Sequence, residues 1–397
     1  MTATAPAPKI RPKDFLGFDQ LLSDEERDIR DTVRAFVADR VLPNVGEWFE
    51  EARIPLELAP ELGKIGVLGM HLEGYGCAGA SATAYGLACM ELEAGDSGVR
   101  SLVSVQGSLA MFAIHRWGSE EHKLQWLPRM AAGEAIGCFG LTEPDAGSDP
   151  GSMRTRARRD GSDWILHGQK MWITNGSAAD VAVVWARSDG DPPTLRGFLV
   201  PKGTKGFTTQ DIHRKLSLRA SVTSELLLDD VRLPADAMLP EVASLRGPLS
   251  CLNEARYGIV WGAVGAARAC FEAALDYSLE RRQFDRPIAS FQIQQQKLAF
   301  MSLEVNRGAL LALHLGRMKD DGRLLSEHVS MGKLANVNAA LEVARNARQV
   351  LGANGVTLEY PVIRHMNNLE SVVTYEGTAD VHALVIGNAL TGINAFR

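Results

Sequence analysis

The stretch Val181-Ala182-Val183-Val184-Trp185 is a continuous apolar run rich in β-branched valine. A short run of this composition predicts a buried β-strand. Similar short runs lie on both sides of it, at Trp164-Ile165-Leu166, Gly197 to Val200 and Leu226 to Leu228. Because glycines and prolines separate these runs, the region from about Cys138 to Pro240 is expected to be a small antiparallel sheet domain.

Helical patterns cover the chain on both sides of this sheet. They extend from Ser23 to about Gly133 and from about Leu249 to the C-terminus. The clearest runs are Glu57 to Ile65, Ala82 to Glu93, Ser101 to Arg116, Ile259 to Tyr277, Phe291 to Arg317, Ser326 to Leu351 and Thr378 to Ala395. Runs of roughly 20 residues near the C-terminus are typical of a helical bundle. We therefore expect an α+β chain, mainly α, with helical, β and helical domains at 15–137, 138–245 and 246–397.

The composition argues against several classes of protein. Of the 397 residues, 46% are hydrophobic and 23% are charged, as in a soluble globular protein. The net charge is −6 and no basic patch stands out, so nucleic-acid binding is not expected. No apolar run approaches the ~18 residues of a membrane span, so no membrane partner is expected. The Ala/Pro-rich leader from Met1 to Lys13 has no apolar core for a signal peptide.

Cysteines and histidines bear on the compartment and on metals. The cysteines are Cys77, Cys89, Cys138, Cys251 and Cys270, and none forms a CxxC pair. An odd, scattered set is typical of reduced core thiols in a cytoplasmic protein. The histidines show no HExxH or paired spacing, so no metal site is expected.

One carboxylate near the C-terminus suggests catalysis. Thr374-Tyr375-Glu376-Gly377-Thr378 precedes a helical pattern, with Thr378 as a natural N-cap and Asp380 in the first turn. Gly377 lets the backbone bend and lets a ligand approach closely. Glu376 would then lie beside exposed N–H donors, which suits a base that removes a proton next to a carbonyl. The alternative is an ordinary surface glutamate before a helix.

Three other segments are candidates for ligand contacts. Gly74 to Gly79 matches GxGxxG by letter, but no strand–helix alternation surrounds it, so a loop between helices is the better interpretation. Leu141 to Asp149 offers small hydroxyls and backbone N–H groups, or is a turn-rich connection. Trp172 and Thr174, two residues apart on an expected strand, point to one side, where the indole could stack on a planar cofactor. The alternative there is a core tryptophan.

Several motifs together resemble the acyl-CoA dehydrogenase family. LTEPDAGSD at 141–149, KMWITNG at 170–176, RRQF at 281–284, QVLGANG at 349–355 and YEGT at 375–378 occur in the family's order across nearly the whole chain. The resemblance implies an N-terminal helical domain, a β domain and a C-terminal four-helix bundle, with FAD between the last two. It also implies a homotetramer that passes electrons to electron-transfer flavoprotein.

The resemblance also assigns roles to residues. Glu376 looks like the catalytic base, Thr142 and Thr174 would bond the flavin ring, and Trp172 would pack against it. Arg281, Phe284, Gln292, Gln349 and Gly352 would meet the FAD of a neighbouring subunit. The full set that matches FAD contacts is Phe139, Leu141, Thr142, Gly147, Ser148, Trp172, Ile173, Thr174, Arg281, Phe284, Gln292, Gln349, Gly352, Thr378 and Asp380.

Three segments are similar to glutaryl-CoA dehydrogenases: 91–101, 251–258 and the C-terminal run from Ala383 to Phe396. In that subfamily the arginine matching Arg100 binds the distal carboxylate of glutaryl-CoA, and the acid matching Glu93 pairs with it. The set implied to contact substrate is Arg100, Glu93, Ser101, Ser104, Asn253, Arg256, Tyr375 and Gly377. A buried substrate carboxylate needs a paired cation, and arginine offers a two-pronged one. Val99 departs from the pattern, because relatives carry an aromatic residue there.

The implied reaction is removal of an α-proton by Glu376, transfer of the β-hydride to flavin, and loss of the distal carboxylate as CO2 to give crotonyl-CoA. Lysine and tryptophan degradation would be the pathway. Four alternatives stay open: oxidation of glutaryl-CoA without decarboxylation, a dehydrogenase for another short acyl-CoA with Arg100 structural, an acyl-CoA oxidase, and a helical scaffold without catalysis.

Overall fold

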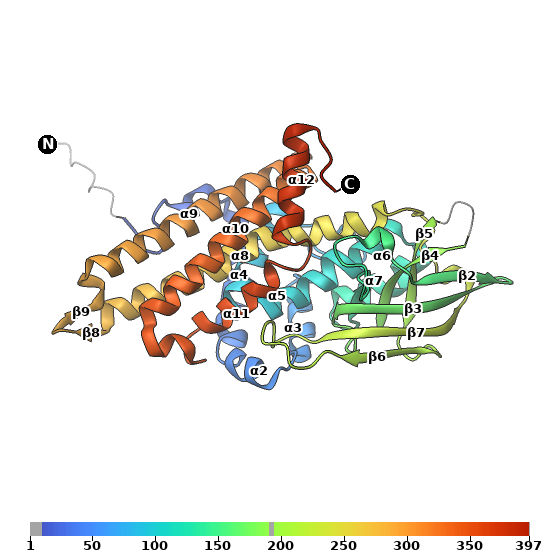
Figure 1. The fold of residues 1–397 in the computed structure, drawn as a ribbon, viewed down its shortest axis with the longest axis horizontal. Coiled ribbons are helices and arrows are strands. Elements are labelled where there is room, and N and C mark those ends of the chain that lie inside the picture. The colour runs from blue at the N-terminus through green and yellow to red at the C-terminus, as the bar shows by residue number, and fades with distance from the viewer. Residues whose placement is uncertain (1–9, 190–193, 397) are drawn as a thin grey trace.

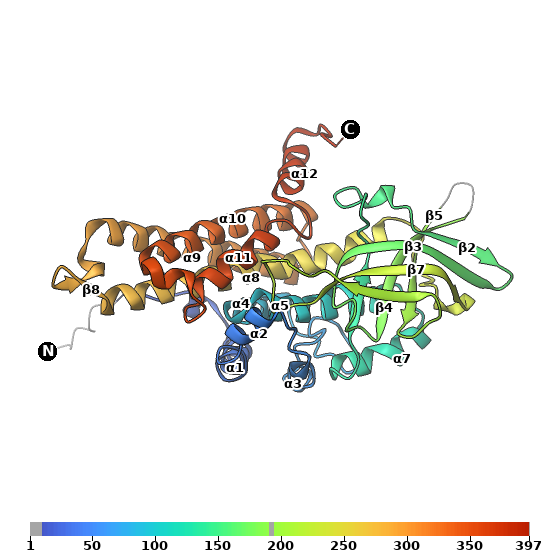
Figure 2. The same ribbon diagram turned by 60° about the horizontal axis from the view of Figure 1, so that its bottom comes forward.

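The computed structural model describes residues 10–189 and 194–396. Met1 to Lys9, most of the expected leader, lie outside the described residues. Long helices occupy one end of the molecule and a β-sheet the other, with shorter N-terminal helices against both (Figure 1). A second view shows the same division and shows the last helix projecting from the bundle (Figure 2).

The N-terminal region is helical, as the sequence predicts. Ser23 begins the first helix with a capping box, because its hydroxyl accepts from the N–H of Glu26 and Glu26 bonds back to the N–H of Ser23. The helices are α1 (Asp24–Phe36), α2 (Val45–Glu51), α3 (Ala59–Lys64), α4 (Ala82–Gly95), α5 (Ser97–Ser104), α6 (Phe112–Trp117) and α7 (Glu120–Ala131). The GxGxxG match lies in the loop between α3 and α4, and Gly74, Gly76 and Gly79 all have positive φ. It is therefore a turn-forming loop, as expected.

The run from Ser101 to Arg116 is not one regular α-helix. A π-helical segment, Val105–Met111, separates α5 from α6. Within it the Gln106 amide accepts from the N–H of Gly137 at 2.8 Å and donates to the carbonyl of Ala135 at 2.7 Å. The wider turn thus carries a side chain that anchors the start of the first strand, a contact that helical periodicity could not reveal.

The β domain is a seven-stranded sheet. The strands are β1 (Gly137–Gly140), β2 (Arg156–Asp160), β3 (Asp163–Thr174), β4 (Val181–Ser188), β5 (Thr194–Pro201), β6 (Phe207–Asp211) and β7 (Thr223–Leu233). The other strand pairs are antiparallel, as expected, but the prediction needs one correction, because β1 and β2 both pair with β4 in parallel. Apolar runs predict strands but not their direction, and the long connections before β4 permit a parallel crossing that a hairpin does not.

The C-terminal region is a bundle of long helices joined to a small hairpin. Its elements are α8 (Arg246–Glu280), β8 (Arg282–Gln283), β9 (Arg286–Pro287), α9 (Gln292–Asp320), α10 (Ser326–Leu351), α11 (Val362–Val372) and α12 (Ala379–Thr391). The sequence patterns missed α11 and placed the start of α8 too late. By length and mean hydropathy (1.3) α8 meets the criteria of a membrane span, although 72% of that stretch is buried inside the protein. Such burial is typical of a core helix.

Candidate active site

A cavity of about 480 Å³ lies where the three regions meet. Its lining comes from α5 and the π-helical segment after it, from the ends of β1 and β3, and from the loop between α11 and α12. The sequence-predicted residues that line it are Arg100, Ser101, Ser104, Phe139, Leu141, Thr142, Gly147, Ser148, Trp172, Ile173, Thr174, Tyr375, Glu376, Gly377 and Thr378. Residues from four separate parts of the sequence therefore share one space.

Glu376 lies on the short loop between α11 and α12, where the backbone is bent. Its φ is +55°, in the left-handed region that a glutamate rarely adopts, and Gly377 follows at +94°. Thr378 then caps α12, because its hydroxyl accepts from the N–H of Val381 at 3.2 Å. The predicted bend at Gly377 and the predicted N-cap at Thr378 are confirmed, and the surface-glutamate alternative is wrong, because Oε2 of Glu376 is buried.

The carboxylate of Glu376 has the properties of a base. Its Oε2 has no hydrogen-bond partner among residues 10–189 and 194–396. Burial raises the pKa of Glu376, while the positive charges of Arg256, Lys333 and Arg100 act in the opposite direction. A desolvated carboxylate with a raised pKa is a stronger base than one in water, which suits proton abstraction.

Two cations, the partly buried Arg256 and the buried Lys333, hold the backbone of this loop. Arg256 on α8 donates from Nε to the carbonyl of Glu376 at 2.6 Å. Lys333 on α10 donates from Nζ to the carbonyls of both Tyr375 and Gly377, the latter at 2.6 Å. The resemblance indicated Arg256, whereas the sequence reasoning did not identify Lys333.

Arg100, which also lines the cavity, projects from α5. Its Nε donates to Oε2 of Glu93 at 2.6 Å, and its Nη2 donates to the hydroxyl of Tyr375. Arg100 is 2% exposed and Glu93 is fully buried, so the expected ion pair is present and is shielded from solvent. Ser97 donates to the second oxygen of Glu93 at 2.8 Å. Burial raises the pKa of Tyr375 to about 12, so its hydroxyl stays protonated at neutral pH.

The base of α5 is fixed by a second buried network. Asp96 caps the helix by accepting from the N–H of Gly98 at 2.6 Å, and its other oxygen accepts from Arg364 and Asn368 on α11. Asn368 in turn accepts from the N–H of Leu218, which lines the cavity. These contacts set the position of Arg100 relative to the loop of Glu376. Neighbouring Val99 is buried in the core of the N-terminal helices and does not line the cavity.

The opposite wall is built from β3 and the loop at 141–149. A bulge in the pairing of β3 with β7 lies between Lys170 and Ile173, and Trp172 has a φ of +63°. Strict alternation is lost, so Trp172, Ile173 and Thr174 all line the cavity. Trp172 is 55% exposed, which contradicts the core-tryptophan alternative and leaves its ring free to contact a planar ligand.

A buried lysine ties the loop to the strand. Lys170 donates to the carbonyl of Leu141 at 3.1 Å and to Glu143 at 2.8 Å. Glu143 also accepts from the N–H groups of Arg154 and Thr155, so both of its carboxylate oxygens have hydrogen-bond partners within the protein. Thr142 is held as well, because its carbonyl accepts from the N–H of Met171 at 2.8 Å.

Part of the predicted set lies elsewhere. Asn253 and Arg256 on α8 and Glu93 on α4 are not among the residues that line the cavity. Phe284 is 87% exposed at the tip of the β8–β9 hairpin, at the far end of the bundle (Figure 1). Arg281, Gln292, Gln349 and Gly352 are exposed near that end, and Asp380 is exposed on α12. This protomer alone does not bring these residues to the cavity.

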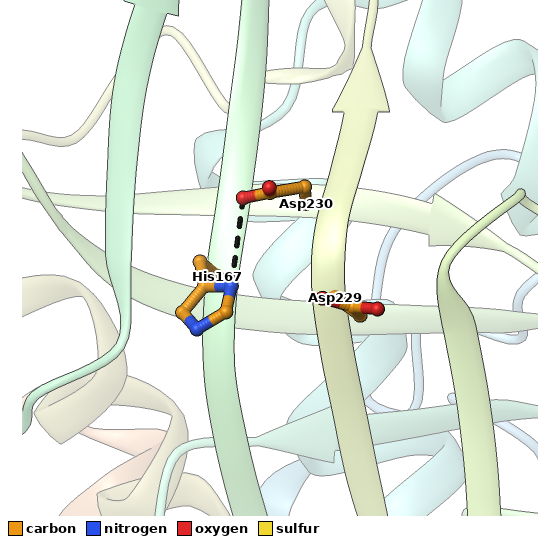
Figure 3. Close-up of side chains that lie close together, drawn as sticks. All are labelled: His167, Asp229 and Asp230. Atoms are coloured by element: carbon orange, nitrogen blue, oxygen red, sulfur yellow. Dashed lines mark ion pairs between the residues drawn. The ribbon is translucent and has the colours of Figure 1, made fainter.

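The sheet also carries an exposed cluster of His167, Asp229 and Asp230 (Figure 3). Their candidate ligand atoms lie within 4.8 Å of one another, and His167 Nδ1 lies 3.5 Å from Oδ1 of Asp230. All three side chains are exposed, and the cluster lies outside the cavity. Exposed acidic groups of this kind are ordinary on a sheet surface.

Sequence profiles of three acyl-CoA dehydrogenase domains match the chain: the N-terminal domain at 23–134, the middle domain at 138–231 and the C-terminal domain at 246–391. The chain therefore belongs to the acyl-CoA dehydrogenase family, which is FAD-dependent. It has the family's fold, and it is an enzyme of this class.

Among solved structures, two of a glutaryl-CoA dehydrogenase from Mycobacterium smegmatis are very similar. One, in complex with FADH2, is 62% identical with a TM-score of 0.96, and the other is 65% identical with a TM-score of 0.95. Each alignment covers 98% of this chain and 100% of that one. A complex of glutaryl-coenzyme A dehydrogenase with glutaryl-CoA is 34% identical with a TM-score of 0.90, over 95% of this chain and 98% of that one.

A curated relative has a different named specificity. The mitochondrial short-chain specific acyl-CoA dehydrogenase of Bos taurus is 34% identical over 373 residues, which are 93% of this chain and 90% of that protein. Family membership alone therefore does not select the acyl group.

Sequence reasoning missed several residues at this site. Lys215, Leu218 and Leu252 line the cavity, and Lys333 and His382 support the loop of Glu376 from α10 and α12. Lys333 and His382 lie on helices whose pattern predicts only packing. A lysine at a position expected to face the bundle core was the one available signal, since lysine is rarely buried without a specific partner.

Proposed function

We propose that the protein is a FAD-dependent glutaryl-CoA dehydrogenase that converts glutaryl-CoA to crotonyl-CoA and CO2. The observation that carries the proposal is Arg100, a buried arginine on the wall of the same cavity as Glu376. A fatty acyl chain needs an apolar pocket end, whereas a guanidinium at that end matches a second carboxylate.

The buried charges support an anionic substrate. Arg100, Arg256 and Lys333 surround the site, against the carboxylates of Glu93 and Glu376. Burial lowers the pKa of Lys333 to about 7, so three positive charges face two negative ones when Lys333 is protonated. Because uncompensated buried charge is costly, the distal carboxylate of glutaryl-CoA completes the balance.

The cavity has features that fit a flavin. The hydroxyls of Thr142 and Thr174 and the indole of Trp172 lie on one wall, with apolar Phe139 and Leu141 beside them. These residues offer polar groups for the ring edge and an exposed aromatic face for the ring plane. FAD bound there supplies the hydride acceptor for the β-carbon of the substrate.

The residues of the chain position the substrate, stabilise the charge that develops on it and transfer its proton. Glu376 removes the α-proton, and the N–H groups of its bent loop stabilise the charge that develops on the thioester oxygen. Arg100 holds the distal carboxylate while oxidation forms the Cα=Cβ double bond conjugated with the thioester. The bond between the γ-carbon and the distal carboxylate then breaks, its electron pair enters this conjugated system as a dienolate, and the carboxylate leaves as CO2. The protonated Glu376 then returns its proton to the four-carbon product, which becomes crotonyl-CoA.

The proposal extends to partners. Electron-transfer flavoprotein is the acceptor that the resemblance implies, and the cytoplasm is the expected compartment. A homotetramer is supported by the exposed apolar residues Leu390 and Ile393 near the end of α12 and by exposed Phe284, because a protomer alone leaves them uncovered.

The test is anaerobic turnover of the purified flavin-bound protein with glutaryl-CoA and an electron acceptor, with products identified by mass. Crotonyl-CoA and CO2 are expected. Accumulation of glutaconyl-CoA would retain the substrate and refute decarboxylation. Flavin bleaching by butyryl-CoA but not by glutaryl-CoA would refute the assignment of Arg100.

A further inference from the structure

Three consecutive backbone carbonyls of the loop that carries Glu376 accept hydrogen bonds from the buried Lys333 and the partly buried Arg256. Those of Tyr375 and Gly377 accept from Lys333, and that of Glu376 between them accepts from Arg256. The two cations come from different helices of the bundle, α10 and α8. The loop is therefore held from both.

Lys333 is used here as a backbone clamp. It is 1% exposed, and in the described part of the chain its hydrogen bonds go to the two carbonyls and to no carboxylate. An ammonium group of this kind is costly to bury, so its placement needs a compensating role. The two carbonyls flank Glu376, whose left-handed backbone is the strained point of the loop.

The clamp fixes the direction of catalytic groups. In a trans peptide the N–H points opposite to the carbonyl of the preceding residue, so holding the Tyr375 carbonyl fixes the direction of the Glu376 N–H. A carbonyl that accepts from a cation also makes its own peptide N–H a stronger donor. The same contact holds Tyr375, whose hydroxyl accepts from Arg100, a further residue of the cavity lining.

We propose that Lys333 is a positioning residue for the reaction, which holds Glu376 and Tyr375 in one fixed relation through the carbonyls on either side of the base. This inference rests on the proposed role of Glu376 and adds to it the device that keeps the base in place. Lys333 acts through the loop and is not itself assigned contact with substrate.

The charged surroundings of Lys333 give a second, measurable effect. Arg256 faces it from α8, Arg100 from α5, and Glu376 from the loop, while His382 packs under Gly377 from α12. Burial lowers the pKa of His382 to about 3, so His382 is neutral and adds no charge. The positive charge of Lys333 lowers the pKa of Glu376, and its removal therefore raises that pKa.

The test compares the flavin-bound wild type with Lys333→Met and with Asn336→Leu. Asn336 is a matched control, because it lies one turn away on α10, is buried, and donates to the carbonyls of Val260 and Gly308. Lys333→Met is expected to slow flavin reduction by glutaryl-CoA about 100-fold, the scale of a roughly 1 Å misplacement of a catalytic group. The acid limb of the rate should move to higher pH, and amide hydrogen exchange over 374–378 should accelerate. Asn336→Leu should change thermal stability alone.

A Lys333→Met rate within about threefold of the wild type, with unchanged hydrogen exchange over 374–378, would overturn the proposal. If that variant yields no folded holoenzyme, Lys333→Gln keeps a donor without the charge, and an unmoved acid limb there would also overturn it. Hydrogen exchange does not depend on turnover. A wild type inactive with glutaryl-CoA but with a loop that Lys333→Met loosens would refute the substrate and support the clamp.

Discussion

Removing the Arg100–Glu93 pair should separate glutaryl-CoA from uncharged substrates. The two side chains are buried and 2.6 Å apart, so replacing Arg100 alone would leave Glu93 as an unpaired buried charge, at a cost of about 3–5 kcal/mol in folding. The informative variant is therefore the double substitution Glu93→Gln/Arg100→Met. The amide that Glu93→Gln introduces retains an acceptor for Ser97, which donates to Glu93 in the wild type.

The expected loss in kcat/KM follows from the ion pair that the distal carboxylate of glutaryl-CoA can no longer form. Without Arg100 the distal carboxylate of glutaryl-CoA enters the cavity unpaired. Truncating one side of a buried charge pair costs about 2–5 kcal/mol, which is roughly a 30- to 4,000-fold loss in kcat/KM. Butyryl-CoA has no distal charge, so its kcat/KM should change by less than about tenfold.

The assay is anaerobic flavin reduction at several concentrations of each thioester, with thermal unfolding measured on the same samples. Glu91→Gln/Arg268→Met is the matched control, because it removes another buried ion pair of α4 that lies outside the cavity. That control should leave the ratio of the two kcat/KM values unchanged. Equal losses on glutaryl-CoA and butyryl-CoA in Glu93→Gln/Arg100→Met would refute the reasoning.

Three further predictions follow from buried carboxylates and cations. Glu376→Gln should slow flavin reduction by about 10²- to 10⁴-fold while glutaryl-CoA still binds, as measured by stopped flow and by titration. Lys170→Met leaves Glu143 unpaired and should cost about 3–5 kcal/mol of stability, with loss of FAD, measured by denaturant unfolding and the flavin-to-protein ratio. Burial opposes ionisation of Glu91, but Arg268 and Arg34 prevail and lower its pKa from 4.5 to about 2. Because its pKa is lower in the folded state, ionised Glu91 contributes about 3 kcal/mol to the free energy of unfolding above pH 4.5. This contribution is lost as the pH falls towards 2. Glu91→Gln should therefore flatten the acid side of the stability profile, and a profile as steep as that of the wild type would contradict this.

Much of the architecture could be predicted because it depends on local periodicity. The apolar spacing on the long helices and the valine run at 181–184 specify a helix or strand without distant contacts. Strand direction could not be predicted, since parallel and antiparallel partners use the same apolar residues. The short helix α11 and the π-helical segment 105–111 were missed for a related reason, because tertiary contacts such as those of Gln106 stabilise them.

Some residues of the candidate site could likewise be identified from the sequence, and others could not. Motifs with unusual local chemistry, such as Glu376-Gly377-Thr378 and Trp172-Ile173-Thr174, identified the loop and strand that line the cavity. Lys333 carries no such signal, because its neighbours in sequence are ordinary helix residues and its partners lie more than forty positions away. A pattern read along the chain cannot report a contact of that kind.

The sequence by itself determined the family, the order of the domains and the acid at position 376, because these depend on residue types at short spacing. The tertiary structure alone decided how the parts act together. It placed Arg100 and Glu376 in one cavity, enclosed the Arg100–Glu93 pair, and set Lys333 and Arg256 against the loop of Glu376. The physical reason is that pKa shifts, charge balance and backbone strain depend on burial and distance in space, and helices far apart in the sequence fix both.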